Sequence, residues 1–554
     1  MKKPLLSEMT LTEKIGQLLM LHGPWQAYGP APTKPLEINE DLVKEATERM
    51  LEEVEKYQPG TFWLDGIPRM SDTFTLAEDK AIADLISSKV KYPMLFGDDS
   101  EGGMQGHYLD RTMGVGALSK GAANDTELTY KIDKGICAEN RAAGKNWRWG
   151  PVIDLPHRLN LGSLGRSVSD NIDTIVAHAT ATIKAHASEG VASTLKHFPG
   201  EDPFEIRDGH FVTPVINASF EDWYNGQGQT FKRMIDAGAL SIMSTHTAFP
   251  AIDDEKLGGM YVPATISKKI STDLLRDTLG FKGVLVTDDM AMGGFGAVAP
   301  REELIIRAVN AGNDVLLNTK AEDVEIIYRA VADGRIPMSR IDESCQRVLD
   351  MKEKIGLFGD EEPACTPAPE AKKLINETAK EISEKALTLL YDRNALIPAS
   401  KENIKSVAIV FISHAEWALS RMDVLKREFE ARGARAKVFD CIDLYNRDEI
   451  FTYDLILYVG YMSQHNPMGL PSFSGRQIKS FFHAFTEASE RSIGVSVGYP
   501  YLHFDCMVAA GTFINTYSID DNTLVGLVKG IYGEIPFVGK SPVDIEPKLR
   551  YVYC

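Results

Sequence analysis

The feature that most constrains the fold is an alternation, through the first 350 residues, of short apolar runs and longer stretches of helical periodicity. The apolar runs resemble buried strands and lie at residues 93–97, 147–152, 191–196, 240–245, 283–287 and 314–318. The helical stretches include residues 125–143, 170–188, 220–237 and 266–279. Strands separated by helices predict βα units and a parallel sheet. A (β/α)8 barrel of the TIM type closes so many units most economically, and an open doubly wound sheet is the alternative.

The character of the sequence changes near residue 359. Residues 359–369 contain three prolines and three acidic residues without apolar periodicity, which indicates an extended linker. Beyond it, further strand-like runs lie at residues 407–412, 436–439, 455–459, 493–498 and 512–516. We therefore expect three segments: a barrel domain over 1–358, a Pro-rich linker over 359–375 and a smaller C-terminal α/β/α sandwich domain over 376–554.

Charge and cysteine content restrict the partners and the compartment. The 554 residues include 60 basic and 78 acidic ones, a net charge of −18 without a basic stripe, so nucleic acid and anionic membranes are not expected partners. The six cysteines form no C-x-x-C pair. The N-terminal residues lack the apolar core of a signal peptide, and no run of about 18 apolar residues occurs. These features predict a cytoplasmic protein and leave its oligomeric state open.

Polar residues stand where the expected barrel strands end, which is where such barrels carry their reactive groups. They are Asp98, Asp99 and Glu101; Asp154 and Arg166; Lys196, His197, Asp208 and His210; Thr245 and His246; and Asp288 and Asp289. Each alone could be a helix cap or a turn residue. Together they predict a pocket for a small, hydroxyl-rich ligand.

Asp288 and Asp289 are adjacent, and neighbouring carboxylates could orient a 2-acetamido group without a protein nucleophile. Successive residues leaving a strand point in opposite directions, however. Asp289 is therefore interpreted as a loop or helix-cap residue.

Several motifs together resemble glycoside hydrolase family 3, in the branch of the β-N-acetylglucosaminidases of bacterial peptidoglycan recycling. They are DSEGG at 99–103, GPVIDL at 150–155, KHFPG at 196–200, DGH at 208–210, MSTHTAFPAID at 243–253, VTDDMAM at 286–292 and RIDESCQRVLDMKEKIGLF at 340–358. The likeness covers residues 8–358 in order. The Asp-x-His pair separates this branch from the β-glucosidases of the family, which take the acid/base carboxylate from the second domain.

The resemblance implies a role for each matching residue. Asp288 matches the nucleophile, and Asp208 with His210 matches the catalytic dyad in which the histidine is the general acid/base. The positions that match sugar-binding or pocket-lining residues are Asp99, Arg166, Lys196, His197, His246 and Met292. Asp154 is expected to hold a loop or Lys196. No cofactor or metal is expected, and the C-terminal domain, including His465 and His503, is expected to be structural.

These residue types suit retaining glycoside hydrolysis. An ionised aspartate can form a covalent glycosyl-enzyme, and a histidine that titrates near neutrality can act first as acid and then as base. We therefore predict a retaining exo-β-N-acetylglucosaminidase acting on peptidoglycan- or chitin-derived glycosides. Three alternatives remain: a β-N-acetylglucosaminide phosphorylase, a β-glucosidase of the same family, and a catalytically silent sugar-binding protein. The phosphorylase is considered because a histidine in place of an acid/base carboxylate would repel phosphate less.

The chain departs from the family pattern in two loops. The family loop KHFPGHGDT is replaced by KHFPGEDPFEIRDGH, which is one residue longer before the Asp-x-His pair and adds the acids Glu201, Asp202 and Glu205. The Arg-rich stretch that often follows EGG is replaced by residues 104–107. We expect these changes to affect the choice of leaving group and the efficiency of the reaction.

Overall fold

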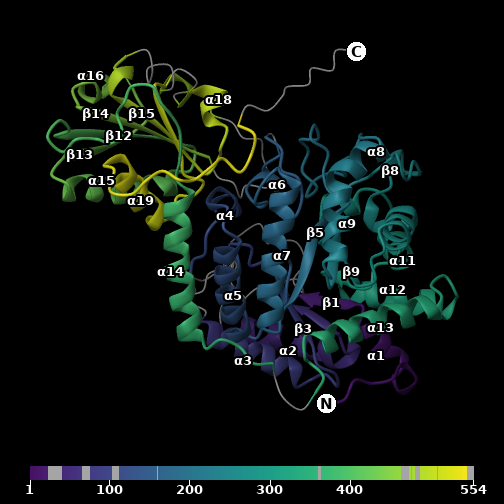
Figure 1. Ribbon diagram of the computed structural model, residues 1–554. Coiled ribbons are helices and arrows are strands. Elements are labelled where there is room, and N and C mark those ends of the chain that lie inside the picture. Colours follow the sequence, from purple (N-terminus) through teal and green to yellow (C-terminus); the bar gives the residue numbers. More distant parts are fainter. Residues whose placement is uncertain are drawn as a thin grey trace. The chain divides into compact units, whose positions relative to one another are not determined.

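The alternation of strands and helices is visible in Figure 1, a computed structural model of the protein. It describes residues 1–22, 40–64, 75–102, 112–158, 160–359, 363–443, 445–462, 473, 475, 477–480, 487–507 and 510–545. Two compact units make up the chain. The barrel unit comprises Met1–Gly114, Tyr130–Asp154 and Ala179–Ile375, and the sandwich unit comprises Val115–Thr129, Leu155–His178 and Asn376–Cys554.

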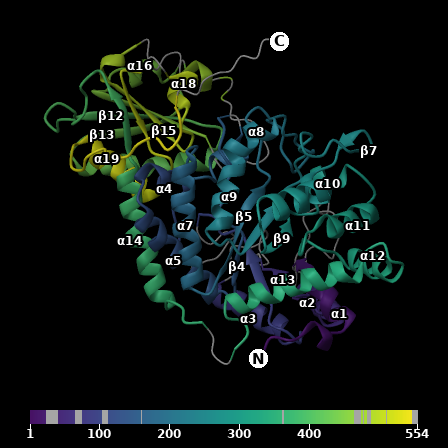
Figure 2. The same ribbon diagram turned by 45° about the vertical axis from the view of Figure 1, so that its right-hand side comes forward.

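The described part of the barrel unit contains an eight-stranded parallel sheet in the order β10-β1-β2-β3-β4-β5-β6-β9. A bridge between Val286 and Val315 joins its two ends, so the sheet is nearly closed (Figure 2). The strands are β1 (Leu19–His22), β2 (Thr61–Trp63), β3 (Leu95–Asp98), β4 (Trp147–Arg148), β5 (Ala192–Phe198), β6 (Ser241–Ser244), β9 (Val284–Thr287) and β10 (Leu316–Leu317). This confirms the barrel and not the open sheet. All six strand-like runs contain strands, whereas β1 and β2 escaped prediction.

Helices follow each strand along the chain. They are α2 (Glu40–Tyr57), α3 (Leu76–Ser87), α4 (Ala117–Ala123), α5 (Thr126–Ala142), α6 (Leu161–Leu164), α7 (Ile172–Ser188), α8 (Phe220–Trp223), η3 (Tyr224–Gly228), α9 (Gln229–Asp236), η4 (Ala264–Ile266), η5 (Lys269–Thr278), α10 (Gly293–Gly296), α11 (Arg301–Ala311), α12 (Ala321–Ala332) and α13 (Met338–Lys354). A short helix, α1 (Leu11–Gly16), precedes β1, and the pair β7 (Lys256–Leu257) and β8 (Met260–Tyr261) lies in the loop after β6.

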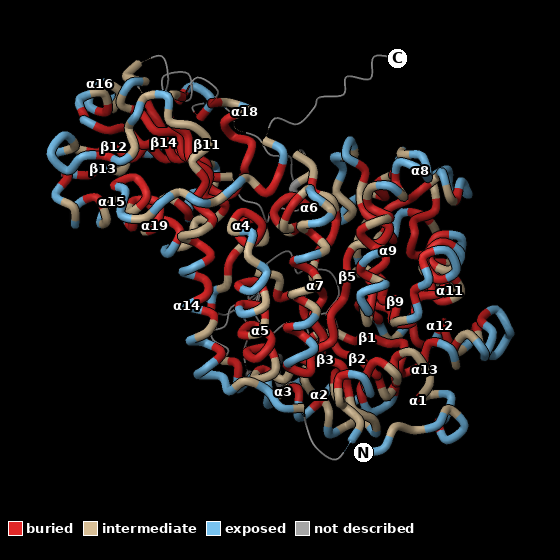
Figure 3. The backbone as a smooth tube through the Cα atoms, viewed as in Figure 1, coloured by how far each residue is buried: buried red, intermediate tan, exposed pale blue. Residues whose placement is uncertain are grey.

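The barrel strands are almost wholly buried, as the mostly red tube of Figure 3 shows, and of their described residues only His22, Trp63 and His197 are of intermediate exposure. Met20, Leu95, Trp147 and Met243 belong to the cluster that fills the interior, as side chains do in such barrels. Gly97 on β3 admits the Trp149 ring, because a Cβ at this position would lie 2.5 Å from that ring. The filled interior leaves the strand ends as the place for a site.

The sandwich unit contains, in its described residues, a six-stranded sheet in the order β11-β16-β15-β14-β12-β13. The strands are β11 (Thr388–Asp392), β12 (Ser406–Ile412), β13 (Arg435–Asp440), β14 (Leu455–Tyr461), β15 (Ser492–Val497) and β16 (Thr512–Asn515). All neighbours are parallel except β11, which pairs antiparallel with β16. The five predicted strands are present, and only the edge strand β11 escaped prediction.

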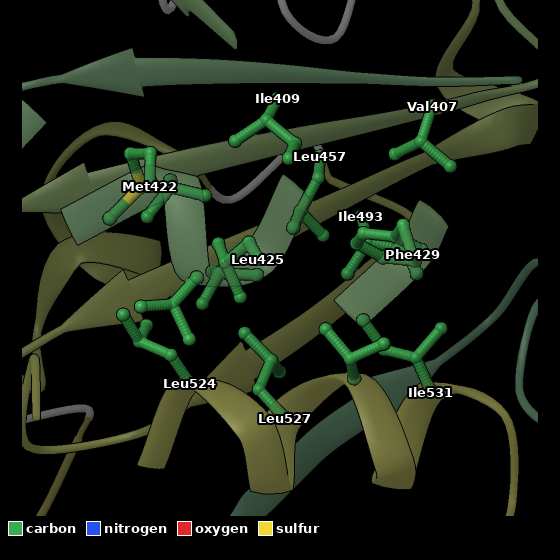
Figure 4. Close-up of a cluster of buried hydrophobic side chains, with 14 of the residues drawn as sticks. Val407, Ile409, Met422, Leu425, Phe429, Leu457, Ile493, Leu524, Leu527 and Ile531 are labelled. Carbon is green, nitrogen blue, oxygen red and sulfur yellow. The ribbon is translucent and has the colours of Figure 1, made fainter. Parts of the chain in front are cut away.

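Helices cover both faces of this sheet. On one face, α15 (Met422–Ala431) and α19 (Asp521–Ile531) direct Leu425 and Leu527 toward Ile409 and Leu457 of the sheet (Figure 4). On the other face, residues of α4 and α18 (Leu502–Cys506) pack in a second apolar cluster. The three layers confirm the α/β/α sandwich.

Helix α14 (Ala368–Ala386) begins inside the stretch 359–375 that was expected to be a linker. Pro369 lies in its first turn, where the missing N–H has no partner in any helix, so this proline is compatible with the helix start. Nowhere in the described ranges does a helix combine the length and the apolar character needed to cross a membrane.

Candidate active site

The predicted site residues of the barrel unit come from the carboxyl ends of four strands. Asp99 follows β3, Lys196 and His197 lie at the end of β5, His246 follows β6, and Asp288 follows β9. The carboxyl ends of parallel barrel strands open on one face, where such barrels carry their active sites. The order of strands and polar residues in the sequence therefore places these groups at one end of the barrel.

Asp288 is a buried carboxylate in a positive environment. Its backbone nitrogen donates to Ser244 O at 2.8 Å, and its Oδ1 accepts from Asp289 N at 2.8 Å. Burial acts to raise the pKa of Asp288, but the charges of His197, His246 and Lys196, with the Asp289 N–H, hold it below its ordinary value of 3.8. Asp288 is therefore ionised at neutral pH.

Lys196 is almost completely buried, with 1% of its side chain exposed, and lies between two carboxylates. Its Nζ is 2.5 Å from Asp99 Oδ1 and 2.7 Å from Glu101 Oε1. Asp99 retains more than a third of its side-chain exposure, whereas Glu101 is largely covered. Glu101 received no role from the sequence, although it follows Asp99 within the same DSEGG motif. The pair fixes the Lys196 ammonium near the strand ends.

Asp154 holds the adjacent residue, His197. Its Oδ2 lies 2.7 Å from His197 Nδ1, and its Oδ1 accepts from His197 N at 2.9 Å. Asp154 itself is fully buried. It was expected to hold a loop or Lys196, and the structure shows that it holds His197 by both backbone and ring. These two contacts fix the orientation of the His197 ring.

Asp208 and His210 form a hydrogen-bonded dyad in the loop after β5. Asp208 Oδ1 lies 2.6 Å from His210 Nδ1 and also accepts from His210 N at 2.8 Å. The His210 side chain remains 41% exposed. With Nδ1 bound to the carboxylate, proton transfer by this ring would use its other nitrogen, Nε2.

The dyad loop is bound to the loop that follows Asp288. Gly293 N donates to His210 O at 2.8 Å, and Gly294 N donates to Gly209 O at 3.1 Å. The Met292 methyl group lies 3.4 Å from the position that a Cβ on Gly209 would take. The two loops that carry the predicted acid/base and nucleophile are thus one hydrogen-bonded assembly.

His246 is fully buried and supports the nucleophile loop. Its Nε2 lies 3.0 Å from the backbone oxygen of Asp289, and its Nδ1 lies 2.9 Å from Thr265 Oγ1. Burial lowers the pKa of His246, although the Asp288 charge opposes this. Its proposed place in the pocket lining stays a prediction.

Asp289 is used within its own loop, as its position after the strand predicted. Its Oδ1 accepts from Ala291 N at 2.8 Å and from Asn318 Nδ2 at 2.7 Å. Burial raises the pKa of Asp289. The two adjacent aspartates therefore have separate environments, one in a positive pocket and one in a turn.

Two predicted features fall outside this group. Arg166 lies in the turn after α6, which belongs to the sandwich unit, and its sugar-binding role stays a prediction. The altered stretch at residues 104–107 lies outside the described residues, as does His465. Within the described ranges, His, Cys, Asp and Glu side chains form no cluster of three or more that could hold a metal ion.

A barrel that gathers a buried ionised carboxylate, a lysine, histidines and an exposed Asp-His dyad at its strand ends has the groups that glycosidases use. The sequence model of the glycosyl hydrolase family 3 N-terminal domain matches residues 10–351. The chain therefore belongs to glycosyl hydrolase family 3, and it is a glycosidase.

Individual relatives agree with this assignment. A β-N-acetylglucosaminidase/β-glucosidase of Cellulomonas fimi is 27% identical over 505 residues, covering 86% of this chain and 88% of the relative. A β-hexosaminidase of Haemophilus influenzae is 32% identical over 239 residues, covering 42% of this chain and 65% of the relative.

Solved structures share the two-domain fold. A family 3 β-N-acetylglucosaminidase of a Paenibacillus species superposes with a TM-score of 0.77 at 23% identity, over 97% of this chain and 99% of that one. A β-glucoside phosphorylase superposes with a TM-score of 0.80 at 24% identity, over 98% and 95% of the two chains. At these identities the likeness concerns the fold.

Proposed function

We propose that the protein is a retaining exo-β-N-acetylglucosaminidase that releases terminal N-acetylhexosamine from β-linked glycosides derived from peptidoglycan or chitin. The observation that carries the proposal is the Asp208–His210 dyad, bonded through the Gly293 and Gly294 amides to the loop of the buried carboxylate Asp288. The names of the relatives from C. fimi and H. influenzae support the choice of sugar.

In the first step, an Asp288 carboxylate oxygen attacks the anomeric carbon while the bond to the leaving oxygen breaks. His210 Nε2 gives its proton to that oxygen, so the leaving group departs as a neutral alcohol. Asp208 stabilises the ring through Nδ1 at 2.6 Å. The low pKa of Asp288 keeps this nucleophile ionised over the whole neutral range.

In the second step, His210, now neutral at Nε2, removes a proton from water, and the water oxygen attacks the anomeric carbon. The bond to Asp288 breaks and the carboxylate is restored, so the sugar leaves with its original configuration. We assign the sugar hydroxyls to Asp99, Lys196, His197 and Arg166, because charged donors and acceptors bind hydroxyls strongly.

The test is turnover of nitrophenyl N-acetyl-β-glucosaminide by Asp288→Ala, which should fall by several orders of magnitude. Near wild-type turnover in this variant would overturn the role of Asp288. The same assay with the nitrophenyl β-glucoside separates the two sugars, and a higher kcat/KM for the glucoside would assign the enzyme to the β-glucosidases. Binding without turnover of either substrate would indicate a sugar-binding protein.

Phosphate is a second candidate for the acceptor. The observation that favours it is that the partly exposed acid/base group is His210, which carries no negative charge when neutral and therefore repels an anion less than a carboxylate would. Phosphate oxygen would then attack the anomeric carbon in place of water. Turnover with and without phosphate, with the released sugar identified as free sugar or sugar 1-phosphate, decides between the two acceptors.

A further inference from the structure

The loop that carries the dyad runs from the end of β5 to the start of α8, and its first part is the segment in which this chain departs from its family. Two of its added acids are used inside the loop. Asp202 is buried, with 3% of its surface exposed, and bridges the two sides of the loop. Its Oδ1 accepts from Phe204 N at 2.8 Å, and its Oδ2 accepts from Asn217 N at 2.7 Å.

Glu205 makes a second bridge nearer the tip. Its Oε2 accepts from Val215 N at 3.1 Å, and both of its oxygens bind the Arg207 guanidinium at 2.5–3.1 Å. Burial acts to raise the pKa of Glu205, but Arg207 and the two backbone N–H groups that it binds hold it below the ordinary value. Glu205 therefore remains an ionised acceptor at neutral pH.

The dyad lies between these bridges and a third attachment. Thr213 Oγ1 donates to Gly294 O at 2.8 Å, beside the Gly293 and Gly294 amides that bind the carbonyls of His210 and Gly209. The segment after the tip is also fixed, because Ile216 N donates to Ala248 O at 2.8 Å. The tip is thus held on both of its sides by hydrogen bonds within the protein.

We infer that Asp202 and Glu205 are positioning residues that close the catalytic loop and hold His210 ready for proton transfer before substrate binds. The inference rests on the acid/base role of His210 in the proposed function. An acid that is already in place avoids the entropic cost of ordering its loop during the reaction. The acids that replace the usual family sequence are then a substitute support for the loop, and not a defect in it.

The experiment compares Asp202→Asn and Glu205→Gln with wild type on N-acetylglucosaminides of different leaving groups. An amide has one acceptor oxygen, so each variant must lose one of the bonds that its carboxylate accepts and set an NH2 group against an N–H donor. The kcat/KM for a sugar or alkyl leaving group, which needs the acid, should fall about tenfold or more. The kcat/KM for a dinitrophenyl leaving group, which departs without a proton, should change by less than about threefold.

Two further variants make the result decisive. Glu221→Gln on the exposed surface of α8 changes the same charge nearby and should leave both values unchanged. His210→Ala should show the largest split between the two leaving groups, and if it shows none, the acid role in the proposed function fails. If His210→Ala shows the split while Asp202→Asn and Glu205→Gln lower both substrates equally or not at all, the positioning role is overturned. Thermal melting checks that each variant is folded. If Asp202→Asn is not folded, the comparison is made with Glu205→Gln, in which Asp202 is intact.

Discussion

Asp154 binds His197 twice, with Oδ2 2.7 Å from the ring Nδ1 and Oδ1 2.9 Å from the backbone nitrogen. Asp154 is fully buried and uses both carboxylate oxygens on one neighbour, so in the proposed function we expect it to act through His197. It fixes the orientation of the His197 ring, and it places a negative charge beside a ring that contributes to the field at Asp288. The strength of sugar binding should therefore depend on a residue that does not itself face the sugar.

Asp154→Asn should lower kcat/KM by about 10- to 100-fold, the equivalent of one lost charge-assisted hydrogen bond. The side-chain amide of this variant keeps one acceptor oxygen, but its NH2 group then faces either the ring N–H or the backbone N–H of His197. Steady-state kinetics on the N-acetylglucosaminide measure the change. Asp236→Asn, on the exposed face of α9, is the matched control and should behave as wild type. Equal activity of the two variants would contradict this role of Asp154.

His197→Gln should move the acidic limb of the pH profile of kcat/KM to higher pH. Burial favours the neutral form of Asp288, and the His197 charge is the largest of the contributions that oppose burial. Its removal raises the Asp288 pKa, so the carboxylate becomes ionised only at higher pH. Activity measured from pH 3.5 to 7 with an activated aryl substrate tests this. An unchanged limb, as expected for the exposed His414→Gln, would show that His197 does not tune Asp288.

Gly294→Ala should displace the dyad loop, because a Cβ there would lie 2.5 Å from Val212 O and 2.6 Å from Gly209 O. Backbone atoms cannot move aside as a side-chain end can, so the loop must shift. A displacement of about 1 Å can reduce the rate of a positioned reaction about 100-fold. Gly296→Ala in the same short helix meets no atom within 4 Å and is the control. Comparable kcat/KM values for the two alanine variants would refute the prediction.

Lys352→Met should remove a pH dependence of stability. Lys352 is fully buried in α13, with Nζ 2.6 Å from Gln17 Oε1, and burial lowers its pKa to about 7. Between this value and the ordinary 10.5, the unfolded chain binds more protons than the folded one, so this lysine makes stability rise with pH. The gain from pH 7 to pH 9 is about 2 kcal/mol in the free energy of unfolding.

Urea unfolding of wild type and Lys352→Met at pH 7, 8 and 9 measures that difference. The variant should be the more stable protein at pH 7, and its advantage should shrink toward pH 9. Two curves that stay parallel over this range would show that Lys352 is not the group responsible.

Local patterns in the sequence were sufficient to predict a strand or helix where that element is long and strongly periodic. The runs that became β5 and β14 are almost wholly buried, and helices such as α7 show clear periodicity. The strands that escaped prediction are β1, β2 and β11, the last an antiparallel edge strand of mostly half-buried residues. Their strand character comes from pairing with neighbours distant in the chain, and that pairing has no local signature.

Some features of the candidate site could likewise be predicted from local sequence, and others could not. The positions of Asp288, Lys196 and His197 at strand ends could be predicted, since strand boundaries follow from local composition. Contacts between loops could not. Glu101, which follows β3, binds Lys196 of β5. The contact between Asp154 and His197 depends on the path of the loop after β4.

The sequence by itself determined the family, the two architectures and the residue types at the mouth of the barrel, because hydrophobic period and motif order are local properties of the chain. The tertiary structure alone decided which charges meet. Asp288 is ionised because nearby Lys196 and His197, together with the Asp289 N–H, offset the effect of its burial. The altered loop is closed because Asp202 and Glu205 reach backbone amides ten and more residues ahead. Electrostatic energy depends on distance in space, and the sequence specifies that distance only through the completed fold.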